Sequence, residues 1–189
     1  LDQLGQLFSP AETKVVQLTK SYRSTRQITE FSRQILENGA QIEPFTREGE
    51  RPQIFLAANE EQMLTYALKQ LKKNQNKAKT TAIIGKTLAE CQQVAQQLIA
   101  TGQQVTLIKT ENQRLAQGTI VVPAFLAKGL EFDEVIVWDA SQANYQADEQ
   151  RQLLYTICSR AMHRLVIIAL KKLSPLFDRV DQNLYDLEK

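Results

Sequence analysis

The sequence predicts an α/β fold with a mostly parallel sheet and helices on both faces, in a single domain. Short β-branched runs alternate with amphipathic helical patterns along almost the whole chain, which is typical of βαβ units. The chain has 189 residues, of which 43% are hydrophobic, and this is enough for one well-buried core. The sequence contains no internal repeat, low-complexity tract or linker that would mark a second domain.

The expected elements follow one another as strand and helix in turn. A short strand at 15–18 is followed by an N-cap stretch at 21–25 and a helix that runs to about Glu37 and stops at Asn38-Gly39. A polar loop is expected at 41–51. Beyond it we expect strands at 53–57, 80–84, 104–108, 119–125, 134–138 and 165–170, helices at 60–73, 88–100 and 148–162, and an amphipathic tail at 175–187.

Charge and cysteine content narrow the function classes. The chain has 23 Lys+Arg against 21 Asp+Glu, so any nucleic-acid binding is expected to be local. Cys91 and Cys158 lie in apolar helical patterns, and we expect reduced core thiols. No apolar run reaches the roughly 18 residues of a membrane span, and no signal peptide is visible, so a cytoplasmic protein is expected. Leu1 is first and Met63 is the first methionine, which favours a piece of a longer protein.

One stretch is similar to the end of a phosphate-binding loop. Gly85-Lys86-Thr87 follows a strand, but the full motif needs a glycine five positions before Gly85, where Thr80 stands. The residues between them form a strand, which cannot wrap a phosphate with its backbone amides. We therefore expect no P-loop in this chain.

The stretch with the densest chemistry is Ala-Lys-Gly-Leu-Glu-Phe-Asp at 127–133, between two β-branched runs. Because open α/β sheets bind ligands at the carboxyl ends of strands, we expect Lys128, Gly129 and Glu131 at such an end. His163 is the single histidine, which excludes a multi-histidine metal site, and we interpret it as structural. Phe132 and Trp138 are interpreted as core residues.

Three motifs resemble those of superfamily 1 helicases of the UvrD/Rep type. Residues 18–25, Leu-Thr-Lys-Ser-Tyr-Arg-Ser-Thr, are similar to motif IV, and residues 127–133 to motif V. Residues 153–156, Leu-Leu-Tyr-Thr, followed by Ser159-Arg160-Ala161, resemble motif VI. The motifs follow the family's order and span nearly the whole chain. Within the family they look most like the HelD type, helicase-like factors that act on bacterial RNA polymerase.

Two departures from the UvrD pattern also favour the HelD-like branch. Pro123 and Phe125 stand where that pattern has Thr and His, residues of its nucleic-acid side. UvrD-type proteins insert a large subdomain before motif V, and here only 109–117 is available for it.

The resemblance implies a RecA-like helicase domain, called 2A, at 15–172. Residues 1–14 would lead in from a preceding domain, and 173–189 would form a C-terminal tail. ATP with Mg²⁺ would be held mainly by a RecA-like domain 1A of the same protein, outside this chain. Arg23 and Arg160 match the family's two arginine fingers, which neutralise charge that develops on the γ-phosphate. The chain alone would hydrolyse nothing.

The resemblance also assigns binding roles. Tyr22 would stack on the adenine, Glu131 would accept from the ribose hydroxyls, and Gly129 would let the backbone approach the phosphates. Nucleic-acid contacts fall on Lys86, Thr87 and Lys128, because a lysine and backbone amides hold phosphates without reading bases. Arg114 and loop residues near Phe125 are further candidates. The implied partners are domain 1A, DNA and RNA polymerase, with no membrane and no metal site in this chain.

Plainer interpretations stay open beside these. From spacing alone, Arg23 and Arg160 are surface arginines, and Tyr22 packs on a sheet edge. Glu131 is then a helix cap or an ion-pair partner, and the loop at 85–87 is solvated. The alternative function is an α/β protein-binding module without nucleotide chemistry. An upstream P-loop and acidic motif would favour the ATPase, whereas a native start codon near Leu1 would favour the module. A small-molecule enzyme is disfavoured, because no dinucleotide loop or nucleophile elbow is present.

Overall fold

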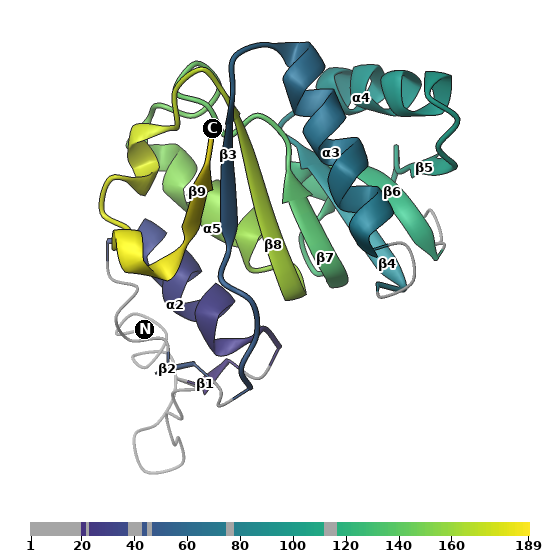
Figure 1. Ribbon diagram of the computed structural model, residues 1–189. Coiled ribbons are helices and arrows are strands. Elements are labelled where there is room, and N and C mark those ends of the chain that lie inside the picture. The colour runs from purple at the N-terminus through teal and green to yellow at the C-terminus, as the bar shows by residue number, and fades with distance from the viewer. Residues whose placement is uncertain (1–19, 22, 38–42, 45–46, 75–77, 112–116) are drawn as a thin grey trace, which may run out of the picture.

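A seven-stranded sheet forms the centre of the computed structural model (Figure 1), which describes residues 20–21, 23–37, 43–44, 47–74, 78–111 and 117–189. Its order is β5-β6-β4-β7-β8-β3-β9, and every pairing is parallel. The strands are β3 (Gln53–Ala57), β4 (Thr80–Gly85), β5 (Val105–Leu107), β6 (Gly118–Pro123), β7 (Phe132–Val137), β8 (Ala161–Leu170) and β9 (Asp186–Glu188).

Helices cover both faces of the sheet. The helices α3 (Glu60–Asn74) and α4 (Leu88–Ala100) lie on one face, and α2 (Arg26–Ile35) and α5 (Arg151–Cys158) lie on the other (Figure 1). Successive strand residues point to opposite faces, so Ile83 packs with the α3/α4 layer and Ile84 with the α2/α5 layer. The predicted fold class is confirmed, with a sheet that is parallel throughout its described strands.

Local signals explain both ends of α4. The helix α4 has the predicted bounds, because Thr87 Oγ1 accepts a hydrogen bond from Glu90 N (3.2 Å) at its start. Just beyond its end Gly102 adopts φ +85°, the left-handed conformation typical of a helix stop. Phe132 and Trp138 are buried, and Cys91 and Cys158 are buried free thiols, as predicted.

The helix predicted at 148–162 was wrong at its carboxyl end. A 3-10 turn at Asp148–Gln150 leads into α5, which ends at Cys158, and Ala161 already begins β8. Sheet pairing overrides the helical preference of this segment, because Ala161 is in register with Phe132 of β7. The backbone therefore turns at Ser159-Arg160, between helix and strand.

The amphipathic tail consists of two 3-10 turns, Pro175–Phe177 and Gln182–Leu184, and the edge strand β9. The Phe31 ring of α2 lies 6.0 Å from that of Phe177 and 5.9 Å from that of Tyr185. A pair of two-residue strands, β1 (Lys20–Ser21) and β2 (Glu43–Pro44), joins segments on either side of α2. The strand predicted at 15–18 and the lead-in at 1–14 lie outside the described residues. Within the described residues, none of the helices has the length and apolar character that crossing a membrane requires.

Candidate functional site

The amino ends of β7 and β8 bring three of the predicted site residues together. Glu131 precedes β7 and Arg160 precedes β8, and these two strands are paired neighbours. The amide of Phe132 donates to the carbonyl of Arg160 (3.0 Å). Arg23 reaches the same place from the turn before α2, and its Nε forms an ion pair with Glu131 Oε1. We call Arg23, Glu131 and Arg160 the arginine cluster.

Glu131 lies at the amino end of β7, and the prediction of a carboxyl-end position was wrong. The strands β6 and β7 both run parallel to β4, so the chain must return from the carboxyl end of β6 to the amino end of β7. A 3-10 turn at Ala124–Leu126 begins this return, and residues 127–131 complete it. Lys128 and Gly129 are exposed along the way, and Gly129 has φ +84°, a conformation that favours glycine.

Arg160 is partly buried and held at three nitrogens. Its Nε donates to Thr156 O (2.9 Å), its Nη1 to Leu130 O (3.2 Å) and its Nη2 to Ser159 Oγ (3.2 Å). Because a guanidinium has five N–H donors, these bonds to described residues leave one donor on each Nη. Burial, and then the charge of Arg23, lowers the pKa of Arg160, which nevertheless stays protonated at any physiological pH. The site thus holds a partly desolvated cation with two donors left for an anion.

Arg23 is held much more loosely. The side chains of Arg23 and Glu131 are 47% and 38% exposed, and an ion pair this open contributes ~0–1 kcal/mol. The cluster holds two guanidinium groups and one carboxylate, which pairs with Arg23 and whose charge also acts on Arg160, so the cluster is net positive. A stronger anion can replace Glu131 as the partner of Arg23 at little cost.

The turn that carries Arg23 is anchored to β8. Ser24 Oγ donates to Ala161 O (2.6 Å), and the amide of Thr25 donates to Met162 O (3.2 Å). Residues of motif IV and motif VI, far apart in sequence, are thereby joined. Tyr22, the predicted adenine contact, lies outside the described residues.

Lys86 and Thr87 lie at the opposite edge of the sheet, at the carboxyl end of β4. Lys86 Nζ donates to Asn144 O and lies 5.0 Å from the centre of the Tyr145 ring, while Thr87 caps α4. Glu90 accepts from the Lys86 amide and, through Oε1, from Asn144 Nδ2 (3.2 Å). Burial is the main cause that raises the pKa of Glu90. Both predicted residues therefore have structural partners at this edge.

Lys128 lines a separate hollow of about 500 Å³ beside the return segment. Its other lining residues include Ile108, Leu126 and Phe125, and the Phe125 side chain is 59% exposed. An exposed aromatic ring next to a lysine offers a stacking face and a phosphate contact together. Arg114, the further candidate, lies outside the described residues.

A buried ion pair between β7 and β8 was not predicted from the sequence. Arg164 of β8 and Glu134 of β7 are 6% and 1% exposed and pair with each other. Arg164 Nη2 also donates to Gln53 Oε1 (2.6 Å) and Gln70 Oε1 (2.7 Å), and its Nε lies 3.2 Å from Glu50 Oε2. Charged residues inside two apolar strand runs were the available signal, because such residues are buried only when paired.

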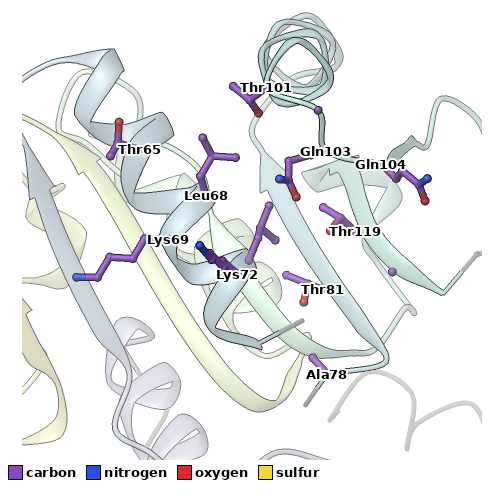
Figure 2. A pocket seen from close by; sticks show the side chains of 13 residues that line it. Thr65, Leu68, Lys69, Lys72, Ala78, Thr81, Thr101, Gln103, Gln104 and Thr119 are labelled. Carbon is purple, nitrogen blue, oxygen red and sulfur yellow. The ribbon is translucent and has the colours of Figure 1, made fainter. Parts of the chain in front are cut away.

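Another hollow, of about 1020 Å³, lies on the α3/α4 face, and none of the predicted site residues lines it (Figure 2). Lys72 sits in the last turn of α3, where a cation offsets the negative end of the helix dipole. Lys69 extends away from Gln103 and Thr119 (Figure 2), and its Nζ lies 5.7 Å from the centre of the Tyr66 ring. Both lysines therefore have partners within α3: the carboxyl end of the helix for Lys72 and the Tyr66 ring for Lys69.

The fold and the cluster together define an α/β domain that presents two arginines at one edge of a parallel sheet. Residues 120–168, which include Glu131 and Arg160, match the model of the UvrD-like helicase C-terminal domain. A solved structure, the C-terminal domain of a possible DNA helicase from Lactobacillus plantarum, is 54% identical with a TM-score of 0.80. The match covers 89% of this chain and 99% of that one. The chain belongs to the family of UvrD-like helicase C-terminal domains, and its fold is RecA-like.

Two viral helicases show weaker likenesses. Nonstructural protein 10 of an arterivirus, solved with DNA, is 11% identical with a TM-score of 0.45, and the match covers 84% of this chain and 36% of that one. The methylated PRRSV helicase is 12% identical with a TM-score of 0.42, and the match covers 69% and 29%. Neither likeness carries any argument below. Among curated proteins, nothing matches the chain.

Proposed function

We propose that this chain is the C-terminal motor domain, 2A, of an ATP-dependent DNA helicase or translocase. In this proposal Arg23 and Arg160 complete an ATP site that is held mainly by a domain 1A of the same protein. The observation that carries the proposal is the arginine cluster. Two arginines from distant parts of the sequence lie close enough for their charges to interact, and one carboxylate, Glu131, pairs with Arg23 and acts on Arg160.

The geometry suits phosphoryl transfer. Cleavage of the γ-phosphate develops negative charge on its oxygens, and a planar guanidinium neutralises that charge with paired hydrogen bonds. Arg160 is fixed by its three bonds and keeps two donors, so it is already oriented for a phosphate. Arg23 would exchange Glu131 for the phosphate as the two domains close.

ATP and Mg²⁺ divide between the two domains in this proposal. The described residues offer donors for phosphate oxygens but no group of three or more His, Cys, Asp or Glu placed to hold a metal ion. Mg²⁺, which would neutralise the β- and γ-phosphate oxygens, is therefore assigned to domain 1A. The chain alone is expected to hydrolyse no ATP.

Three further residues complete the nucleotide side. Glu131 would accept from the ribose hydroxyls, which requires its ion pair with Arg23 to open, so the two residues change partners together. Tyr22 precedes Arg23 in the chain and would stack on the adenine. Gly129 lies on the exposed return segment, where its backbone could approach the phosphates.

DNA is proposed to run past Phe125 and Lys128. Phe125 is the most exposed of the large apolar side chains in the described part, and it stands where the UvrD pattern has a nucleic-acid-side His. A base could stack on its ring while Lys128 meets a phosphate. Lys86 and Thr87 remain further candidates, but Lys86 must first leave the Asn144 carbonyl.

The HelD-like branch, with RNA polymerase as a partner, is the finer part of the proposal. Pro123 and Phe125 in the two diverged positions support it. So does the short connection from β5 to β6, which spans only 108–117.

The test is the ATPase activity of the full-length parent protein with single-stranded DNA present. Arg23→Ala and Arg160→Ala are each expected to lower kcat about 10³-fold, the effect of removing an arginine finger. Arg51→Ala is the matched control, because Arg51 is exposed and pairs only loosely with Asp186 (3.8 Å). Near-normal turnover in either variant would remove that arginine from the mechanism. A parent that binds no ATP would instead support the protein-binding module.

A further inference from the structure

The segment 47–50, which we call the strap, lies against the start of α2. The amide of Arg26 donates to Arg47 O (2.8 Å), and the amide of Gly49 donates to Gln27 Oε1 (2.9 Å). The Glu48 carboxylate pairs with Arg26 Nε at 2.8 Å. The strap is therefore bound along the first turn of the helix that follows Arg23.

One side chain of the strap, that of Arg47, contacts the backbone that carries the arginine cluster. Arg47 Nη2 donates to two backbone carbonyls, that of Arg23 (2.6 Å) and that of Met162 (2.9 Å). Met162 is the second residue of β8, and Arg160 stands just before that strand. One guanidinium nitrogen thus joins the backbone that carries Arg23 to the strand that follows Arg160.

The strap is also fixed on its other sides. A Cβ added to Gly49 would lie 2.5 Å from Thr25 Cγ2, so the strap packs directly on the residue that caps α2. Glu50 Oε2 lies 3.2 Å from Nε of the buried Arg164, which ties the strap to the middle of the sheet. Arg47 is therefore presented from a supported backbone rather than from a free loop.

We propose that Arg47 is the positioning residue of the arginine cluster, and that it fixes the backbone of Arg23 so that Arg23 and Arg160 reach one phosphate. The inference rests on the proposed function of Arg23. Arg160 is oriented by its own three hydrogen bonds, whereas the Arg23 side chain is held only by the exposed pair with Glu131 among the described residues. Once that ion pair opens, the position of the Arg23 backbone sets the range that its guanidinium group can reach. A small displacement there costs rate, because catalysis depends on ångström-level placement.

The first experiment measures kcat and KM for ATP in the full-length parent protein carrying Arg47→Ala. We expect kcat to fall about 10- to 100-fold and KM to stay within about twofold, since the nucleotide is held mainly by the other domain. Arg47→Lys should recover part of the loss, because an ammonium group can still donate to the two carbonyls. Arg51→Ala, at the position directly after the strap, is the control and should behave like the wild type.

A double-mutant cycle separates positioning from general structure. If Arg47 acts only through Arg23, then Arg47→Ala should cost nothing further in an Arg23→Ala background. An equal loss in both backgrounds would overturn the inference, and so would an unchanged kcat in the single variant. Near-normal turnover in Arg23→Ala itself would instead defeat the proposed function of Arg23. Circular dichroism and thermal unfolding identify any variant that does not fold, and Arg47→Lys then replaces Arg47→Ala in the same cycle.

Discussion

The cations at the amino ends of the strands and those at the carboxyl ends have opposite environments. At the amino edge, Arg23 pairs with the exposed Glu131, and Arg160 keeps donors unused by its described neighbours. At the carboxyl edge, Lys86 is engaged by the Asn144 carbonyl and the Tyr145 ring, and Thr87 by the helix that it caps. A cation at an edge of this sheet is therefore a candidate ligand contact only where its hydrogen-bond donors are not already bound to neighbouring protein groups.

The largest expected effect contrasts two buried or half-buried acids. Glu134→Ala removes the buried carboxylate that pairs with Arg164 and leaves it with the exposed Glu50, so it should cost about 3 kcal/mol of unfolding free energy. Glu90→Ala, at the carboxyl edge, removes hydrogen bonds from neutral donors and should cost only about 1 kcal/mol. Urea unfolding of the two variants checks this, and equal losses would contradict the contrast.

A second contrast exchanges the cations themselves. Arg160→Lys keeps the charge but loses the planar fork that both anchors the side chain and presents two donors. Under the proposed function, kcat for ATP hydrolysis by the parent protein should therefore fall about 100-fold. Lys86→Arg at the other edge should leave kcat nearly unchanged. Full activity in Arg160→Lys would show that charge alone suffices at the amino edge.

The smallest expected effect is a pH dependence at the carboxyl edge. The folded pKa of Glu90 is raised above 4.5, mainly by burial, so the stability that its protonated form contributes is present below 4.5 and is lost as pH rises through the raised pKa. Glu90→Gln removes this titration and should flatten that part of the stability curve. Urea unfolding of both proteins across this pH range provides the measurement, and parallel curves would exclude the effect.

The fold was predictable because alternating strand and helix patterns specify parallel βαβ units even when the exact bounds of the elements are not known. The position of motif V was not, because sequence does not show that residues 124–131 run back past β4 to reach the start of β7. The site depended on resemblance, since spacing alone made Arg23 and Arg160 ordinary surface arginines. The Glu134–Arg164 pair escaped prediction because each residue alone is costly to bury, and the sequence does not show that its partner, 30 positions away, lies beside it.

The place of β3 in the sheet has a consequence for biosynthesis. Its two hydrogen-bonding neighbours are β8 and β9, the last two strands of the described chain to leave the ribosome. The apolar strand β3 therefore emerges early and stays unpaired through most of translation, a state in which open strand edges invite aggregation. Nascent-chain protection of β3, for example by a chaperone, would have to last until β8 and β9 have been synthesised.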